Sequence, residues 1–214
     1  MQLMNTLPLP LLWAAATVSC FPTDGGALHL QQPAPISVSN ITWTGEIHEN
    51  GPNMTFTGSS LKAIEEQIKE FSPGFSPGVV LSSSENVTFP GVERVFLKTV
   101  GDEVAQGTVW ESEVLAGIEA IRGYTGYCRQ LPTLQGQPLS CSKPFCQYGR
   151  ELYNAILFCN HNTWDAVQRC SVFADHAQRI YDRCYDPTGD EKLFKGQSYD
   201  GDGFSVIVGS VDHC

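Results

Sequence analysis

Alternating hydrophobic and polar residues stand on both sides of an early turn in the chain. Ile41 and Trp43 share one parity before the turn, and Met54 and Phe56 share one parity after it. Asn50-Gly51-Pro52, between them, is a combination that favours chain reversal. Alternation on both sides of a turn predicts a β-hairpin.

An amphipathic helix is predicted directly after this hairpin. Ser60 can cap its first turn, Pro73 ends the pattern, and Glu65 stands four residues before Lys69, a spacing that favours an ion pair. The β-β-α unit of residues 36–72 is too small to be stable alone, so we expect it to pack on the rest of the chain. The apolar face of the helix consists of Leu61, Ile64, Ile68 and Phe71.

The second half begins after a predicted loop at residues 73–91. Residues 92–100 favour a strand because their apolar residues are Val, Phe and Leu. A helix that ends at Gly123 follows, and then a loop rich in Gly, Pro and Gln at residues 128–141. The apolar residues of that helix are Val114, Ile118 and Ile121.

Three more elements complete this half. Residues 152–159 have the length and the Tyr, Ile and Phe content of a buried strand, which we predict, although their spacing also fits a helix. Residues 164–184 are predicted to be helical and residues 204–208 to form a closing strand. The order β-α-β-α-β predicts an α+β fold: a small antiparallel-leaning sheet with helices on one face. The expected buried face of the last helix holds Phe173, Ala177, Ile180 and Cys184.

Charge and composition exclude some classes of protein. The 214 residues carry a formal net charge of −10, which argues against nucleic acid and anionic lipid as partners. Hydrophobic residues make up 42 %, enough for a real core. We expect a monomer that uses no cofactor.

The first residues have the pattern of a secretory signal. Residues 7–18 are an apolar run, too short and too broken by prolines to span a bilayer. The signal is assigned to residues 1–19, with cleavage after Ala16, Ser19 or Cys20 left open. Residues 20–35 lack periodicity and are interpreted as a tether, ahead of the hairpin-helix unit and its loop at 36–90.

Eight cysteines in an exported chain predict structural disulfides. We expect Cys214 to bond in the region of Cys141 and Cys146, because such a bridge would pin the last strand. A zinc site is disfavoured, since no second close pair follows Cys141 and Cys146. The predicted disulfide cysteines are Cys128, Cys141, Cys146, Cys159, Cys170, Cys184 and Cys214, with Cys20 added if the signal is cut before it.

Three sequons predict N-glycosylation at Asn40, Asn53 and Asn86. All three lie before residue 90. The first half is therefore expected to be the glycan-bearing side of the molecule.

Several segments of the second half resemble one family. The pattern is similar to that of secreted fungal effector proteins of the smut killer-toxin-like and necrosis-inducing group, over about residues 141–214. The resemblance implies a stapled α/β sandwich, here residues 91–214, in which a cysteine-ended helix lies between two strands. It also implies a toxin- or virulence-effector-like binder. The matching segments are Phe158-Cys159-Asn160, Cys170 and Cys184 with thirteen residues between them, Gly196-Gln197-Ser198-Tyr199, Phe204-Ser205-Val206-Ile207-Val208 and Cys214.

Catalytic motifs fail on chemical grounds. Residues 74–78 match Gly-x-Ser-x-Gly, but Pro77 has no N–H to donate to an oxyanion. His161 and Asn162 could belong to a Cys-His-Asn protease site only if a cysteine supplied a free thiolate. An even number of cysteines, all paired, leaves none. We interpret both motifs as loops, and His176 as a residue on the solvent side of its helix.

Two weaker clusters were weighed as binding sites. Residues 200–203 (Asp-Gly-Asp-Gly) suit a tight turn better than calcium, since no bidentate Glu follows. An acidic surface for a basic partner could form around it, and four tyrosines could seed a contact surface. The acidic set is Asp182, Asp186, Asp190, Glu191, Asp200 and Asp202, and the tyrosines are Tyr124, Tyr127, Tyr148 and Tyr153.

These patterns predict a secreted, non-catalytic, effector- or toxin-like protein that binds a protein or cell-surface target of a host or competitor. Two alternatives stay open. One is a secreted hydrolase that uses an unrecognised pair of carboxylates, and the other is a structural protein associated with the cell wall.

Overall fold

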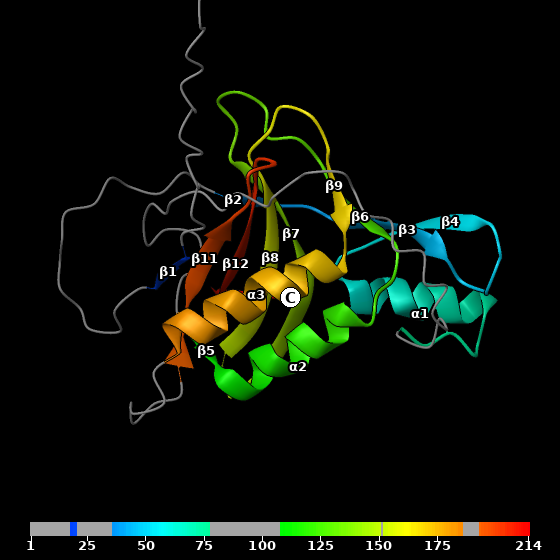
Figure 1. Ribbon diagram of the computed structural model, residues 1–214, viewed down its shortest axis with the longest axis horizontal. Coiled ribbons are helices and arrows are strands. Elements are labelled where there is room, and N and C mark those ends of the chain that lie inside the picture. The colour runs from blue at the N-terminus through cyan, green and yellow to red at the C-terminus, as the bar shows by residue number, and fades with distance from the viewer. Residues whose placement is uncertain (1–17, 21–35, 78–107, 151, 186–192) are drawn as a thin grey trace, which may run out of the picture.

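The chain has a disulfide-stapled α+β fold with mostly antiparallel sheets, as its sequence predicts (Figure 1). The computed structural model describes residues 18–20, 36–77, 108–150, 152–185 and 193–214. Within them the largest sheet has six strands in the order β1-β11-β12-β8-β7-β2. These strands are β1 (Val18–Cys20), β2 (Ile36–Val38), β7 (Leu139–Gly149), β8 (Leu152–Asn160), β11 (Gly196–Tyr199) and β12 (Phe204–Val211).

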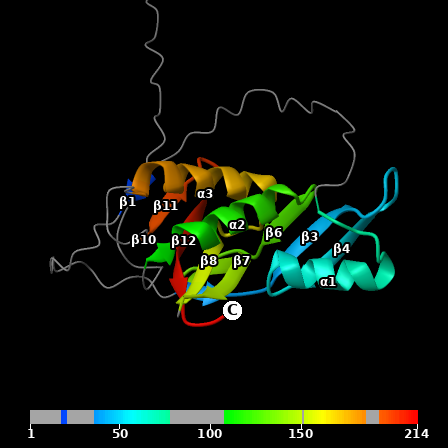
Figure 2. The same ribbon diagram turned by 90° about the horizontal axis from the view of Figure 1, so that it is seen from below.

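Two helices cover one face of this sheet, as expected (Figure 2). They are α2 (Glu111–Arg122) and α3 (Ser171–Cys184). Phe158 of β8 stacks on Phe173 of α3 with ring centroids 4.1 Å apart, and Phe204 of β12 meets Phe158 edge-on. All three rings are buried, so this aromatic cluster joins helix and sheet. A two-stranded sheet of β5 (Val109–Trp110) and β10 (Leu193–Phe194) lies beside α2.

A four-stranded sheet connects the two halves of the chain. The predicted hairpin forms its first two strands, in which Trp43 pairs with Phe56. The first hairpin strand also pairs with a strand of the second half, Thr42 opposite Arg129. The N-terminal unit thus packs on the rest of the chain, which confirms the prediction. In order, the strands are β4 (Asn53–Gly58), β3 (Ile41–Glu46), β6 (Tyr127–Gln130) and β9 (Ala166–Arg169).

The predicted helix after the hairpin is α1 (Leu61–Phe71). Ser60 caps it by accepting a hydrogen bond from the backbone N–H of Ala63, at 3.2 Å. Glu65 and Lys69 form the expected ion pair. Phe71, expected on the buried face, is 67 % exposed because it stands in the last turn of α1, although its ring still lies 6.0 Å from that of Phe56 in β4.

Two predicted boundaries are wrong. Residues 164–184 are not one helix: residues 166–169 form β9, and α3 begins only at Ser171. The segment 128–141 is not all loop, because Cys128 lies in β6. Both corrections have one cause: β6 and β9 pair with each other, and this contact between distant segments overrides local preference.

Other predicted segments fall outside the described residues. These are the signal at 1–19 up to residue 17, the tether at 20–35 except Cys20, the strand at 92–100 and the loop beyond Pro77. Val18–Cys20 pairs with β11 as an edge strand. Of the three cleavage positions left open, only the cut after Ala16 keeps this strand whole.

Three disulfides have both of their cysteines among the residues whose side chains are described. Cys128–Cys170 links β6 to the start of α3, Cys141–Cys159 joins the neighbouring strands β7 and β8, and Cys146–Cys214 ties the last residue to β7. The bond of Cys214 confirms the expected region for its partner. Cys184 is disulfide-bonded as well, whereas the side chain of Cys20 lies outside the described part of the chain.

Brief treatment with a reductant is expected to open the disulfide Cys146–Cys214 before Cys128–Cys170 and Cys141–Cys159. Cys214 is exposed and Cys146 half-buried, whereas the four cysteines of the other two bridges have no exposed surface. A thiolate must reach a sulfur to attack it, so burial slows the reaction. Alkylation and peptide mass spectrometry after brief treatment with dithiothreitol measures the order. Earlier opening of Cys141–Cys159 would contradict this prediction.

Candidate functional site

Exposed hydrophobic side chains gather where two loops meet. The β6–β7 and β8–β9 loops lie side by side at the top of Figure 1, and the backbone N–H of Thr133 in the first donates to the carbonyl of Asn162 in the second, at 2.9 Å. Eight large hydrophobic side chains are exposed among the described residues, and four of them come from these loops and β9. We call these four the loop-end surface: Leu131 (49 % exposed), Leu134 (58 %), Trp164 (65 %) and Val167 (51 %).

A single buried amide organises this surface from beneath. Asn160, the last residue of β8, is fully buried. Its Nδ2 donates to the carbonyls of Gln130 at 3.3 Å, Leu131 at 3.1 Å and Trp164 at 2.7 Å. Its Oδ1 accepts from the backbone N–H of Asn162 at 2.9 Å. One side chain therefore holds both loops, each at the residue that carries an exposed hydrophobic group.

Thr133 makes the second connection between the loops. Its hydroxyl donates to the carbonyl of Asn160 and accepts from the backbone N–H of Ser140, at 2.8 Å. Hydrogen bonds that fix both loops before a partner arrives reduce the entropy that binding must remove. The loop-end surface is therefore preorganised.

A wide depression adjoins Trp164. It has a volume of about 580 Å³ and lies between the β8–β9 loop, β9 and the β11–β12 turn. Gln168 of β9 donates to Oδ2 of Asp202 in that turn at 3.0 Å, and Asn162 donates to the carbonyl of Asp202 at 2.8 Å. These bonds join its walls. Its lining residues are Asn162, Trp164, Asp165, Ala166, Val167, Gln168, Gly201, Asp202 and Gly203.

Gly203 permits the close approach of the turn to the loop. Its φ of +79° lies in the left-handed region, and a Cβ there would stand 2.2 Å from Oδ1 of Asn162. The predicted tight turn at residues 200–203 is confirmed by the bond from the Gly203 N–H to the Asp200 carbonyl, at 3.2 Å. Arg129 of the neighbouring strand β6 pairs with Asp165 through Nε at 2.8 Å and Nη2 at 2.5 Å, both to Oδ2.

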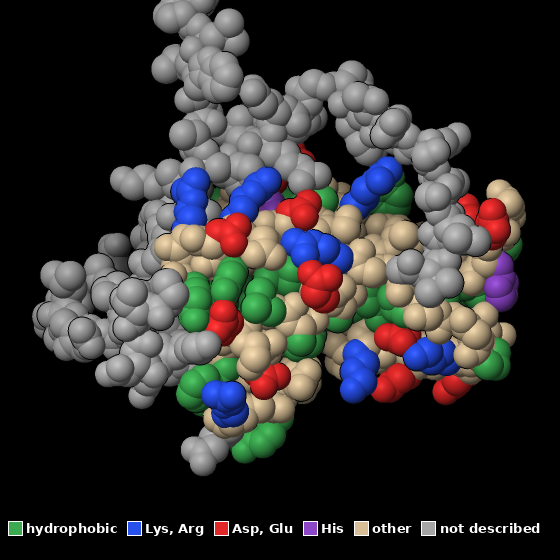
Figure 3. Space-filling model, turned by 60° about the horizontal axis from the view of Figure 1, so that its bottom comes forward, with side chains coloured by type: hydrophobic (Ala, Val, Ile, Leu, Met, Phe, Trp, Pro, Cys, Tyr) green, Lys and Arg blue, Asp and Glu red, His purple; other side chains and the backbone are tan. Residues whose placement is uncertain are grey.

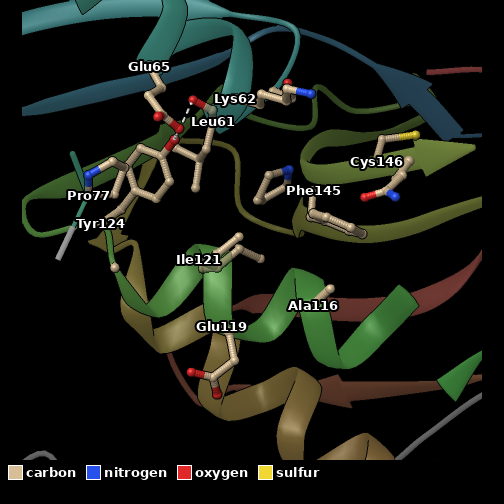
Figure 4. A pocket seen from close by; sticks show the side chains of 15 residues that line it. Leu61, Lys62, Glu65, Pro77, Ala116, Glu119, Ile121, Tyr124, Phe145 and Cys146 are labelled. Carbon is tan, nitrogen blue, oxygen red and sulfur yellow. Dashed lines mark hydrogen bonds between the residues drawn. The ribbon is translucent and has the colours of Figure 1, made fainter. Parts of the chain in front are cut away.

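A second hollow, of about 430 Å³, lies between α1, α2 and β7 (Figure 4). Tyr124 stands at one end, its hydroxyl 2.8 Å from the Leu61 carbonyl and 3.1 Å from Oε2 of Glu65, and Phe145 stands at the other. Burial, and then the nearby Glu65 carboxylate, raise the pKa of Tyr124 well above its usual range. Pro77 lies on the rim, and the chain beyond it is outside the described residues. We therefore assign this hollow no ligand.

A serine, a histidine and an aspartate meet inside the core. Nδ1 of His176 lies 2.8 Å from Oγ of Ser198, and its Nε2 lies 3.2 Å from Oδ2 of Asp200. The expectation that His176 faces solvent is wrong, because its side chain is fully buried against the sheet. Ser198 is equally buried and cannot meet a substrate. These contacts join α3 to β11 and its turn.

The other residues considered for catalysis lie apart from one another. Phe75 is buried 6.3 Å from the ring of Trp43, in the turn after α1 where the Gly-x-Ser-x-Gly motif begins. His161 contacts Ser205 through Nε2 at 2.8 Å, and desolvation by the surrounding protein lowers the pKa of His161, although part of its side chain stays exposed. No described cysteine is free, so none can supply a thiolate to His161.

Two of the three predicted glycosylation sites lie on exposed residues. Asn40 precedes β3 and Asn53 begins β4, whereas Asn86 lies outside the described residues. Both asparagines belong to the hairpin at one side of the four-stranded sheet, and β9 is the edge strand at the other side. Asn53 lies at the end of the hairpin away from the loops. Asn40, however, follows Ser39, whose hydroxyl accepts from Nε2 of Gln130 at 2.9 Å, so a glycan on Asn40 would lie beside the β6–β7 loop.

The four tyrosines do not form one exposed cluster, and half of the acidic set lies outside the described residues. Tyr124 is buried, while the exposed Tyr148 packs on Tyr153 at the β7–β8 hairpin, 4.9 Å between centroids. Asp200 is buried, and of the other acids only Asp182 and Asp202 are described. In the view of Figure 3, acidic and basic side chains are interspersed. We find no single charged surface among the described residues in that view.

Comparisons of the chain with protein-family models, with curated proteins and with solved structures give no match. No helix within the described ranges is long and apolar enough to cross a membrane. The same ranges hold no group of three or more His, Cys, Asp or Glu side chains placed to bind a metal ion. The function must therefore be argued from the loop-end surface itself. Sequence periodicity missed that surface, because Trp164 was assigned to a helix.

Proposed function

We propose that this chain is a secreted, non-catalytic binding protein of the effector or toxin type, which attaches to the cell surface of a host or competitor through its loop-end surface. The observation that carries this proposal is the rigid display of Leu131, Leu134, Trp164 and Val167 above a buried Asn160. Exposed hydrophobic groups that are held in place are typical of recognition sites.

The rest of the molecule fits the role of a scaffold. Disulfides join the segments on which the two loops stand, since Cys128 lies two residues before Gln130 and Cys159 directly before Asn160. Such cross-links are typical of exported proteins. The resemblance to killer-toxin-like effectors supports the same role, and so does the secretory signal that the sequence predicts.

Trp164→Ala is expected to weaken attachment to target cells by about 30-fold, the loss typical of a central aromatic contact. The fold should be unaffected, because the Asn160 amide bonds to the backbone carbonyl of Trp164. Flow cytometry of fluorescently labelled protein on a panel of plant, fungal and bacterial cells measures the attachment.

Phe71→Ala is the matched control, since Phe71 is 67 % exposed but lies on α1, outside the loop-end surface. It should attach like the unmodified protein. Equal attachment by the Trp164 variant and the unmodified protein would refute the proposal, as would absence of attachment across the panel.

A further inference from the structure

We propose that the depression beside Trp164 binds a neutral, hydroxyl-rich saccharide chain. This inference rests on the proposed function and names the chemical class of its target: glycans of the cell surface. It depends on the side chains that line the depression and on how their polar atoms are already engaged.

The aromatic wall suits a sugar ring. Trp164 lines the depression and is 65 % exposed, so one part of its indole is free to contact a ligand. A pyranose ring has faces of C–H groups that stack on an indole through dispersion, while its hydroxyls point outward at the edges. The indole of Trp164 matches the C–H face of the sugar, and polar groups around it match the hydroxyls at the edges of the sugar.

Those polar groups are carboxylates and amides. Arg129 contacts only Oδ2 of Asp165, and Gln168 contacts only Oδ2 of Asp202. The Oδ1 atom of Asp165 therefore lies outside that ion pair, and as a carboxylate oxygen it can accept from a sugar hydroxyl. The amides of Asn162 and Gln168 each direct one N–H to Asp202, and the second N–H and the oxygen of an amide supply the donor and acceptor that hydroxyl groups need.

Other ligand classes fit less well. A fatty chain would remove water from the carboxylates of Asp165 and Asp202 and offer their oxygens no hydrogen bond in return. A phosphate would meet these two carboxylates, and the charge of Arg129 is already engaged by Asp165. A peptide strand added to the edge of β9 would have to displace the bond that Gln168 makes across to the turn.

The size of the depression agrees with this class. Its volume of about 580 Å³ falls within the range of small-molecule sites, roughly 300–1,000 Å³. It is open rather than enclosed, so a chain longer than the site can continue past its rim. A polymer is therefore a better match than a single sugar.

The test titrates the full-length secreted protein with hexasaccharides of β-1,3-glucan, β-1,4-glucan, chitin and α-mannan, followed by isothermal calorimetry. At least one is expected to bind with a Kd on the order of 0.1–1 mM. Trp164→Ala should weaken that binding by at least about ten-fold, and Trp164→Phe should retain most of it because an aromatic face remains. Asp165→Asn should weaken it as well.

Leu134→Ala is the control, because Leu134 belongs to the loop-end surface but does not line the depression. It should bind the hexasaccharide unchanged. Circular dichroism shows whether each variant is folded. If no hexasaccharide binds at about 10 mM, or if binding survives Trp164→Ala, the inference is wrong.

The outcomes separate this inference from the proposed function. Attachment to cells that depends on Trp164, without binding of any hexasaccharide, would overturn the inference, keep the proposed function and indicate a protein target. Hexasaccharide binding that depends on Trp164, without attachment to any cell, would support the saccharide site and overturn the proposed function.

Discussion

Asn160→Ala is expected to lower the free energy of unfolding by roughly 3 kcal/mol and to loosen both loops of the loop-end surface. The substitution leaves three carbonyls and the N–H of Asn162 without their present partner, in a place where Asn160 itself has no exposed surface. A buried polar group without a partner costs about 1–3 kcal/mol, and water can enter to reduce the sum.

Urea unfolding measures the stability, and hydrogen exchange at residues 131–138 and 161–165 measures the loosening. Attachment to target cells should fall as well, although Asn160 is buried and touches no target. Asn160→Asp is informative, because the carboxylate keeps the acceptor for Asn162 but replaces the donor of three hydrogen bonds with a negative charge.

Asn154→Ala is the matched control. Asn154 is a buried asparagine on the same strand, whose Nδ2 donates to Gly149 and Leu152 at 3.3 Å and whose Oδ1 accepts from the N–H of Trp110 at 3.0 Å. It should also destabilise the protein, by about 1–2 kcal/mol, but leave loop exchange and attachment unchanged. If the two variants loosen the loops equally, Asn160 has no special role in organising them.

Local signals in the sequence predicted the elements that need no distant partner. The turn at residues 50–52 sets the hairpin, and Ser60 caps α1. Each of these depends on residues within a few positions of one another. The cysteines also carried a local signal, because a cysteine as the last residue of the chain predicts a disulfide that holds the last strand. The bond of Cys214 to Cys146 confirms that prediction.

The candidate site could not be predicted in this way, because it is built from contacts between distant segments. β6 and β9 have four residues each, and β6 pairs with β3, more than eighty positions away. The motif around Asn160 was visible in the sequence, but the three carbonyls that it binds belong to the end of β6 and to two different loops. A single exposed tryptophan in a loop belongs to no repeating pattern of hydrophobic residues, so periodicity cannot identify it.

His176 was misplaced although the sequence carried a signal for it. It stands three residues after Phe173 and four before Ile180, so the helical period places it on the buried face with them. Its polarity favoured the opposite interpretation. A buried histidine is tolerated here because β11 and the following turn supply polar partners, and those partners are visible only once α3 is packed on the sheet.

His176→Phe is expected to lower the free energy of unfolding by about 3–5 kcal/mol, since it leaves the buried Asp200 carboxylate without the imidazole that now contacts it. The double variant with Asp200→Asn should cost less than the two single variants added, because the amide carries no charge to bury. Urea unfolding of all three measures this coupling.

The control for this experiment is His161→Ala. His161 bonds to Ser205 on the neighbouring strand, but it keeps solvent-exposed surface, so its loss should cost below about 1 kcal/mol. If His176→Phe costs no more than His161→Ala, the contact with Asp200 does not support the sheet.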